Sequence, residues 1–312
     1  MSLACGIDVG GTKIAGGVVD EKGAILEELR VESPATDVRA IEAAIEKLVT
    51  ELRTRHPIEA VGVGAAGYID KARAVVLFAP NLAWRDLDLK SDLERALDLP
   101  VVVENDANAA AWGEFEFGAG HDVDDLLLVT VGTGVGGGVV LDGSPYRGAF
   151  GVGAEIGHMR VVPDGILCGC GNRGCFEMYA SGSALVREAR TAARSSLLAA
   201  DLLDRAGGDA DAITGPLITD AARAGDTFAL EQLAALGRWL GEGIASLTAV
   251  LDPAVVVIGG GVSAADELLL GPTRAAFAAQ LTGRGHRPML EIRKAQLGNR
   301  AGLIGAADLT RH

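Results

Sequence analysis

Short, continuous hydrophobic runs alternate along this chain with longer segments whose apolar residues recur at helical spacing. Continuous runs bounded by glycine or polar residues predict buried strands. The predicted strands are Leu3 to Asp8, Lys13 to Val19, Ala60 to Gly64, Pro100 to Glu104, Leu126 to Val131, Val139 to Leu141 and Ala254 to Ile258. Strands separated by helical segments are typical of an α/β protein.

Helical periodicity is clearest in two segments. Between Asp37 and Leu52 the apolar residues fall on one helical face, and Thr36 or Asp37 precedes it as a cap. A second apolar stripe predicts a long helix from Thr227 to Leu251 that ends before Pro253. The other expected helices are Ala107 to Phe117, Ala264 to Leu281 and a short helix opened by a capping box at Ser91 to Glu94, while the polar stretch Asp204 to Gly215 predicts an exposed loop.

Two segments share one plan of apolar strand, tight Gly/Thr turn and second apolar strand. They are Leu3–Val19 and Leu126–Leu141. This similarity favours a duplicated α/β unit with one such hairpin at the start of each copy. Coincidence is the alternative, since hairpins with glycine turns are common.

Length, composition and charge narrow the class of protein. The 312 residues fit two α/β lobes, and 49% apolar against 22% charged residues excludes a disordered chain. The net charge of −14 opposes binding to nucleic acid or to anionic membranes. The sequence has neither a targeting signal nor an apolar run long enough for a membrane span, so we expect a soluble, cytoplasmic protein.

The glycine-rich turns are candidate phosphate sites. Gly132, Gly134 and Gly137 match G-x-G-x-x-G, but the strand that follows contradicts a dinucleotide-binding fingerprint, which requires a helix there. Backbone N–H groups of such hairpin turns can still bind phosphate. Ordinary tight turns are the alternative. A nucleotide site would use Asp8, Gly10, Gly11, Thr12, Lys13, Thr133, Gly134, Gly260 and Gly261, with Asp8 orienting a hydrated Mg²⁺.

Three of the four cysteines lie within eight residues, at positions 168, 170 and 175. Such a cluster predicts a zinc site, and His158 is the natural fourth ligand because it lies ten residues before Cys168. Three loosely placed thiols are the alternative. A closed site with three cysteines and one histidine would be structural, because it leaves no coordination position for water. Cys5 lies inside a predicted strand and is expected to be a core residue.

Carboxylates flank the expected sites. Asp106 follows a strand and precedes a helix, so it is a candidate general base, with a role as helix N-cap as the alternative. As a cap it would be exposed to the helix dipole, which would keep the pKa of its carboxyl low. Glu155 and Glu177 flank the cysteine cluster and could accept hydrogen bonds from a polyol. A solvated surface acid is the alternative for each.

In order along the chain, these motifs resemble those of the ROK family (repressors, open reading frames, sugar kinases), and most closely its bacterial glucokinases. The motifs are Asp8-Val9-Gly10-Gly11-Thr12-Lys13, Glu104-Asn105-Asp106, Gly132-Thr133-Gly134-Val135-Gly136, Glu155-Ile156-Gly157-His158 and the cysteine segment 168–177. The resemblance implies an actin-like (ribonuclease H-like) ATPase fold with two lobes around a central cleft. It implies a small lobe of residues 1–107, to which residues 298–312 return, and a large lobe of residues 108–297 with the zinc loop.

The resemblance also implies the reaction. ATP with Mg²⁺ would phosphorylate O6 of glucose, with Asp106 as the base, and the zinc would be structural. The sugar-contacting positions would be Asn81, Asn105, Asp106, Glu155, His158 and Glu177. It also implies a homodimer or homotetramer, with no nucleic-acid or membrane partner.

Other functions stay open at this stage. Repressors of the family that this chain resembles carry an extra N-terminal helix-turn-helix domain. A sugar-responsive repressor is disfavoured because the first expected strand begins at Leu3, which leaves no room for that domain, and because the chain is acidic. A filament-forming or chaperone-like ATPase is disfavoured by the zinc and sugar motifs. Fructose, mannose, N-acetylglucosamine or N-acetylmannosamine could replace glucose, and polyphosphate could replace ATP, although no basic cluster indicates it.

Overall fold

The computed structural model describes residues 2–312, which form two compact units. Unit 1 comprises the chain up to Leu128 together with Gly137–Ala154 and Ala295–His312. Unit 2 comprises Val129–Gly136 and Glu155–Lys294. None of the helices in the described residues combines the length and apolar character that a membrane span requires.

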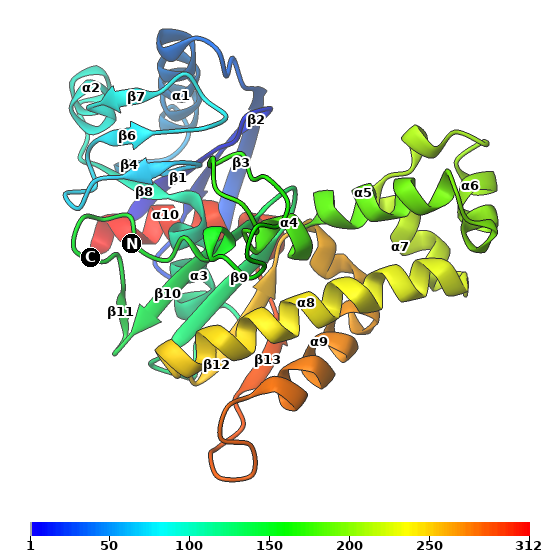
Figure 1. Ribbon diagram of the computed structural model, residues 1–312. Helices are drawn as coiled ribbons and strands as arrows, with labels where there is room; N and C mark the ends of the chain where they lie inside the picture. Colours follow the sequence, from blue (N-terminus) through cyan, green and yellow to red (C-terminus); the bar gives the residue numbers. More distant parts are fainter. Residues whose placement is uncertain (1) are drawn as a thin grey trace. The chain divides into compact units, whose positions relative to one another are not determined.

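Unit 1 is built on a five-stranded sheet in the order β3-β2-β1-β4-β8 (Figure 1). Its strands are β1 (Leu3–Val9), β2 (Lys13–Val19), β3 (Ile25–Glu32), β4 (Ile58–Ala65) and β8 (Val101–Asn105). The hairpin β1–β2 is antiparallel, whereas β1, β4 and β8 run parallel. Parallel strands end at one edge of the sheet, so Asp8 in β1 and Asn105 in β8 lie at that edge, on either side of β4.

Side chains alternate between the two faces of this sheet. Cys5 and Ile7 of β1 join the core formed with α1 (Val38–Arg53) and α2 (Leu89–Leu97). Ala4, directly before Cys5 and on the opposite face, packs with Leu303 of α10 (Ala301–Asp308). A small antiparallel sheet of β5 (Tyr68–Ile69), β6 (Val76–Phe78) and β7 (Arg85–Leu87) completes the unit.

Glycines bring α10 into direct contact with backbone. A Cβ atom at Gly62 of β4 would lie 1.7 Å from the carbonyl oxygen of Ala306, and one at Gly305 of α10 would lie 1.8 Å from that of Ala109 in α3 (Asp106–Phe117). Any larger side chain would therefore push α10 away. The segment that leads into α10 is held by buried Glu114 of α3. The Glu114 carboxylate accepts hydrogen bonds from the backbone N–H groups of Gln296 and Leu297.

A second sheet has the order β11-β10-β9-β12-β13. Its strands are β9 (Leu126–Val131), β10 (Val135–Leu141), β11 (Ser144–Pro145), β12 (Val255–Gly259) and β13 (Glu291–Lys294). As in the first sheet, the outer pair β10–β11 is antiparallel and the pair β12–β13 is parallel. The repeated order agrees with the duplication predicted from the two hairpins.

Helices make up most of unit 2. The long helix α8 (Thr227–Leu251) packs along α9 (Glu267–Gln280), and the two lie side by side in Figure 1. The remaining helices are α4 (Glu177–Ala180), α5 (Gly182–Ala193), α6 (Ala200–Arg205) and α7 (Gly215–Arg223), with short 3₁₀ turns between several of them. Asp226 caps α8 through the N–H of Ala229, and Asp252 ends it in a left-handed conformation directly before Pro253.

Most predicted elements agree with the structure to within two or three residues, but three differ. The capping box at Ser91 is wrong, because α2 begins at Leu89 and Asp88 accepts the N–H of Ser91. Strand β10 begins at Val135, directly after the glycine turn, and residues 204–205 and 210–212 of the expected polar loop are helical. The compact units also differ in extent from the expected lobes, because α3 packs along α10 within unit 1; the functional lobe boundary at residues 107 and 108 stays a prediction.

Candidate functional site

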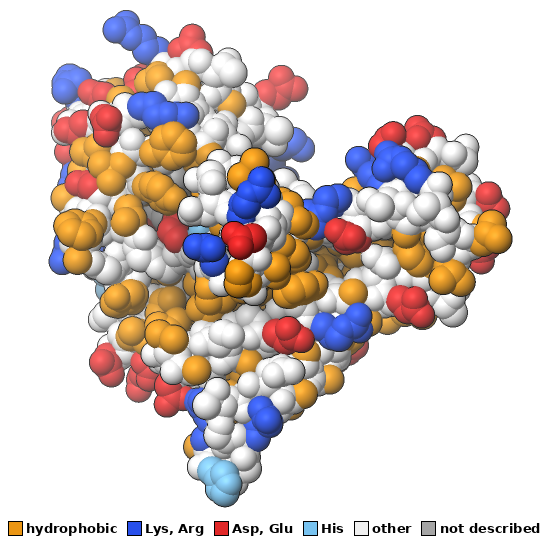
Figure 2. Space-filling model, viewed as in Figure 1, with side chains coloured by type: hydrophobic (Ala, Val, Ile, Leu, Met, Phe, Trp, Pro, Cys, Tyr) orange, Lys and Arg blue, Asp and Glu red, His pale blue; other side chains and the backbone are white. Residues whose placement is uncertain are grey.

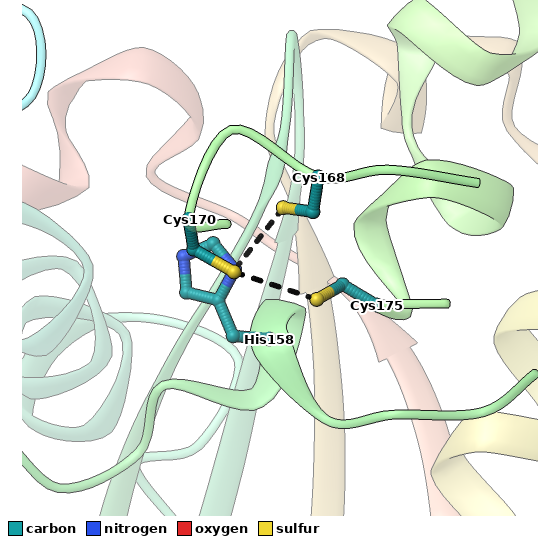
Figure 3. A group of neighbouring side chains, drawn as sticks. All are labelled: His158, Cys168, Cys170 and Cys175. Atoms are coloured by element: carbon teal, nitrogen blue, oxygen red, sulfur yellow. Dashed lines mark hydrogen bonds between the residues drawn. The ribbon is translucent and has the colours of Figure 1, made fainter. Parts of the chain in front are cut away.

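The predicted metal ligands converge in unit 2. His158 and the thiols of Cys168, Cys170 and Cys175 each offer one ligand atom, and these atoms all lie within 4.8 Å of one another. Figure 3 shows the four side chains pointing toward a common centre. The Nδ1 atom of His158 lies 3.7 Å from Sγ of Cys168, and Sγ of Cys170 lies 3.6 Å from Sγ of Cys175.

These separations fit a tetrahedral zinc site. A Zn–S bond of about 2.3 Å gives neighbouring ligand atoms a separation of about 3.8 Å. Burial raises the pKa of the Cys168 thiol, so the thiolate form requires a nearby cation. Three sulfurs and one imidazole are a donor set that zinc prefers, and their geometry agrees with the prediction of a closed structural site.

The loop that carries the cysteines is shaped by two glycines. Gly171 and Gly174 have φ values of +90° and +77°, in the left-handed region that glycine occupies without strain. A Cβ at Gly174 would also lie 1.6 Å from the carbonyl oxygen of Val162. The N–H of Cys168 donates to the carbonyl of Asn172, which closes the turn around Cys170.

Glu177 lies directly beside the metal ligands. Its Oε1 atom accepts a hydrogen bond from the Cys168 thiol at 3.0 Å and lies 3.7 Å from Nδ1 of His158. Its other oxygen, Oε2, would lie 2.6 Å from a Cβ at Gly134 of the second glycine turn. Glu155 precedes the turn Ile156–His158, and the carbonyl of Glu155 accepts the N–H of His158. The structure thus gathers Glu177, His158 and Gly134 around the zinc loop.

Asp106 and Asn105 lie where β8 ends and α3 begins. Asn105, and not Asp106, is the N-cap, because its side chain accepts the N–H groups of Ala107 and Asn108. The Asn105 amide donates to the carbonyl of Gly67. Asp106 occupies the first position of the helix, and burial raises the pKa of its carboxyl although the N–H of Ala107 opposes the shift. The expectation of a low pKa from the helix dipole is therefore wrong, because desolvation outweighs it.

Asp8 forms an electrostatic pair with Asp106. Burial, followed by the negative charge of Asp106, raises the pKa of Asp8 to about 6, while Arg30 acts in the opposite direction. Both residues adjoin Gly302: a Cβ there would lie 3.6 Å from the Asp106 carbonyl oxygen and 4.0 Å from the Asp8 carboxyl carbon. Two close carboxylates that resist ionisation are a suitable place for a hydrated divalent cation.

The first glycine turn, residues 10–13, lies at the surface of unit 1. Gly11, Thr12 and Lys13 are exposed, and the N–H of Gly10 donates to the carbonyl of Lys13 to close the turn. A Cβ at Gly11 would lie 3.4 Å from the backbone oxygen of Asn81, so this predicted sugar contact lies beside the turn. The open backbone of Gly11 and the hydroxyl of Thr12 are suited to phosphate oxygens.

The second and third glycine turns meet at a cavity within unit 2. A cavity of about 880 Å³ is lined by Thr133 of the second turn and Gly261 of the third. Gly260, with φ +82°, allows close packing, since a Cβ there would lie 2.5 Å from the carbonyl oxygen of Val131. The cavity extends between α5 and α7, where its lining combines apolar with cationic and hydroxyl side chains: Leu185, Val186, Arg190, Pro216, Thr219 and Arg223.

Sequence reasoning missed these cavity residues. Arg190 and Arg223 lie on helices that read as ordinary solvated faces, and nothing in their spacing predicts a shared cavity. It also missed the ion pairs of Glu104, which is 1% exposed, accepts a hydrogen bond from Nε of Arg73 at 3.1 Å and lies 2.7 Å from Nε of Arg147. The only signal was the position of Glu104 in the Glu-Asn-Asp motif.

Comparisons with known proteins bear on the whole chain. The ROK family model matches residues 4–312. A glucokinase of Streptomyces coelicolor is 49% identical over 312 residues, which cover 100% of this chain and 98% of that protein. A glucokinase of Halalkalibacterium halodurans is 38% identical over 98% of this chain and 94% of its own length. A ROK family glucokinase from Streptomyces griseus, solved in complex with glucose and AMPPNP, has 52% sequence identity and a TM-score of 0.91, covering 99% of both chains.

Proposed function

Because the chain belongs to the ROK family, we propose that it transfers the γ-phosphate of ATP to O6 of glucose, giving glucose 6-phosphate and ADP. The chain has the actin-like ATPase fold of ROK kinases. Glucose and AMPPNP in the Streptomyces griseus relative support this pair of substrates. The observation in this chain that carries the proposal is the partly buried Asp106 carboxyl with its raised pKa, directly after β8.

Asp106 acts as the general base. As O6 of the sugar bonds to the γ-phosphorus, the bond from that phosphorus to the leaving ADP breaks, and the O6 proton passes to the Asp106 carboxylate. Its raised pKa makes this carboxylate a better proton acceptor than an exposed aspartate. Asn105 holds the start of α3 in place through its cap, so the carboxylate keeps its position.

The sugar hydroxyls bind to Asn81, Asn105, Asp106, Glu155, His158 and Glu177. The orientation of the His158 ring supports its role: Nδ1 faces Cys168 and serves as the metal ligand, which leaves a proton on Nε2 for donation to a hydroxyl oxygen. The carboxylates of Glu155 and Glu177 accept hydrogen bonds from neighbouring hydroxyls.

The nucleotide uses the glycine turns. The backbone of Gly10 and Gly11, with Thr12 and Lys13, binds phosphate oxygens in unit 1, and Thr133, Gly134, Gly260 and Gly261 do so in unit 2. Asp8 orients the hydrated Mg²⁺, which would neutralise charge on the phosphates when bound. The adenine ring of ATP binds in the cavity lined by Val186 and Pro216.

The cysteine loop is structural in this proposal. His158, Cys168, Cys170 and Cys175 would hold a zinc ion that cross-links the loop. Through this cross-link the loop fixes Glu177 and the ring of His158 at the sugar, and no chemical step passes through the metal.

A coupled ADP-release assay tests the function. The full chain, with zinc content verified, is assayed with ATP and Mg²⁺ against glucose, fructose, mannose, N-acetylglucosamine and N-acetylmannosamine. Turnover with glucose well above the others supports the proposal. Turnover with another sugar keeps the mechanism and replaces the substrate, whereas sugar binding without turnover would indicate a sensor.

We also propose that the protein acts in the cytoplasm as a homodimer or homotetramer, as its family resemblance implies. Light scattering coupled to size exclusion gives the mass directly. A monomer at micromolar concentration would contradict the oligomer.

A further inference from the structure

A second charged pocket lies in unit 1, outside the residues assigned to sugar or nucleotide. It has a volume of about 640 Å³ and is lined by residues of two segments, Lys71 and Arg73 from one and residues 145–149 from the other. Arg147 joins the two segments, since it is 8% exposed and its Nη atoms donate to the carbonyls of Asp70 and Lys71. The pocket is thus held by a buried cationic side chain.

The pocket carries an excess of positive charge. Lys71, Arg73 and Arg147 contribute three cations, and within residues 2–312 the one carboxylate that forms an ion pair with them is that of Glu104, which is buried. The nearby Asp70 carboxylate is occupied, because it accepts the N–H groups of Ala74 and Val75. The Asp70 carboxylate keeps its negative charge, so three cations against two carboxylates leave an excess of one positive charge, in a chain whose net charge is −14.

Hydrogen-bond donors in the pocket are open to a ligand. Among residues 2–312, no acceptor is recorded for the Lys71 ammonium, for the Nη atoms of Arg73 or for the backbone N–H groups of Gly148 and Ala149. Gly148 has φ +70°, the left-handed conformation that exposes successive N–H groups to an anion. Tyr146 is 46% exposed at the same pocket and offers a ring and a hydroxyl.

The backbone at Arg73 supports a ligand-binding role. Arg73 has φ +57°, whereas the other non-glycine residues with positive φ are six aspartates and one alanine. Aspartate occupies this region at small cost, but a long side chain does so rarely. The conformation places the Arg73 guanidinium between the buried Glu104 and the pocket. Charged side chains of both signs are interspersed over the face seen in Figure 2, so an excess of one sign within a pocket is a local feature.

We propose that this pocket binds a phosphate dianion, either inorganic phosphate or the phosphate group of a phosphate monoester. The excess of positive charge favours an anion, and a guanidinium, an ammonium and backbone N–H groups match the oxygens of a phosphate. The site is separate from the phosphates of the nucleotide, which use the glycine turns.

Binding there acts on the catalytic segment through Glu104. One oxygen of Glu104 pairs with both arginines, and the other accepts the N–H of Asn105 and the amide of Asn108. A phosphate that draws Arg73 toward the pocket weakens the ion pair between Arg73 and Glu104. Glu104 lies two positions before Asp106, so the change reaches the catalytic segment. Phosphate is therefore an inhibitor of turnover; this second step rests on the proposed function, whereas binding does not.

Calorimetric titration of the full chain with inorganic phosphate, glucose 6-phosphate and glucose tests the site. Lys71→Gln removes one cation from an exposed position and leaves the Arg147 and Glu104 pairs intact, and Lys22→Gln is the matched control on an exposed turn of the same unit. We expect Lys71→Gln to weaken phosphate binding by about fivefold, the loss for one charge near water, and Lys22→Gln to leave it unchanged.

The titrations with inorganic phosphate and with glucose 6-phosphate distinguish the two possible sources of the phosphate group. Binding of inorganic phosphate that depends on Lys71 supports a site for the free anion, and Lys71-dependent binding of glucose 6-phosphate alone supports a site for the ester. Equal affinities in wild type and Lys71→Gln, or absence of binding to the wild type at millimolar concentration, overturn the proposal. Inhibition of turnover that is weaker in Lys71→Gln supports the link to Asp106. A protein without kinase activity that still shows Lys71-dependent phosphate binding would refute the proposed function and retain the site.

Discussion

The carboxyl group of Asp8 and the backbone carbonyl of Asp106 adjoin the same glycine of α10, Gly302, and the charge of Asp106 adds to burial in raising the pKa of Asp8 to about 6. Strands β1 and β8 place the two residues at one edge of the sheet, on either side of β4. The two carboxylates resist simultaneous ionisation unless a cation is bound. Substitutions of either residue therefore test the proposed metal binding, the stability and the proposed catalysis.

Replacing Asp106 by Asn should reduce kcat by about 10²- to 10⁴-fold, because the amide cannot accept the O6 proton. Since Asn keeps the shape of the side chain, sugar binding should change little, and thermal stability near neutral pH should not fall, because a desolvated charge is removed. Steady-state kinetics and calorimetric glucose titration measure both effects. Asp98→Asn is the control, because Asp98 is exposed and has φ +51°, which Asn also adopts. Wild-type turnover in Asp106→Asn would rule out the base assignment.

Magnesium should stabilise the protein through Asp8. The folded-state pKa of about 6 lies above the ordinary aspartate pKa of about 3.9, so the folded state holds this proton more tightly than the unfolded state. The contribution of Asp8 is therefore most favourable below about pH 4 and declines as the pH rises through about 6, by at most about 3 kcal/mol. Without Mg²⁺, Asp8→Asn should raise the free energy of unfolding at pH 7.5 and change it little at pH 4.

Denaturant unfolding with and without Mg²⁺ checks this expectation. The ion should raise the stability of the wild type at pH 7.5, because a divalent cation offsets the repulsion between the carboxylates. It should raise the stability of Asp8→Asn much less. Equal stabilisation of both proteins by Mg²⁺ would place the ion elsewhere.

Cys170→Ser should lower bound zinc from about one ion per chain to nearly none, because a serine hydroxyl is a poor zinc ligand. Glucose affinity should fall with it, since the loop holds Glu177 and His158. Metal analysis and glucose titration on the same preparation test the link. Cys5→Ala is the matched control. Because Cys5 is buried in the core of unit 1, this substitution should leave the zinc content unchanged. Full glucose affinity in zinc-free Cys170→Ser would separate the metal from the sugar site.

Gly62→Ala should destabilise the protein by about 1–3 kcal/mol or more, because the added Cβ would lie 1.7 Å from the Ala306 carbonyl oxygen and α10 would have to shift. Gly64→Ala, two residues along the same strand, is the control, since its Cβ would meet no atom closer than 3.6 Å. Urea unfolding of both variants gives the comparison. If the two alanines cost the same, the packing of α10 on β4 is looser than the structure indicates.

Parts of the site that are compact in sequence could be predicted, and parts assembled from distant segments could not. Cys168, Cys170 and Cys175 are close enough along the chain for ligand chemistry alone to indicate the metal centre. The pairing of Glu104 with Arg147 joins residues that no periodicity relates, and the cavity arginines on α5 and α7 resemble any solvated helix face.

The fold shows the same distinction. Strand and helix positions followed from apolar runs, and the two similar hairpins predicted the repeated strand order. The start of α2 was misplaced because Asp88 and Ser91 are both capping residues, and only the backbone geometry decides between them. The pKa of Asp106 was misjudged because burial, which a sequence does not give, outweighs the helix N-terminus.

The position of α10 has a consequence for the order in which the protein forms during synthesis. Unit 1 needs residues 295–312 to cover the glycine backbone of β1 and β4, yet all of residues 155–294 are made first. The nascent N-terminal sheet therefore waits on the ribosome with one face uncovered while the whole of unit 2 emerges. Chaperones that bind exposed sheet surfaces have their longest opportunity on that face, and a stalled or truncated chain would carry it permanently.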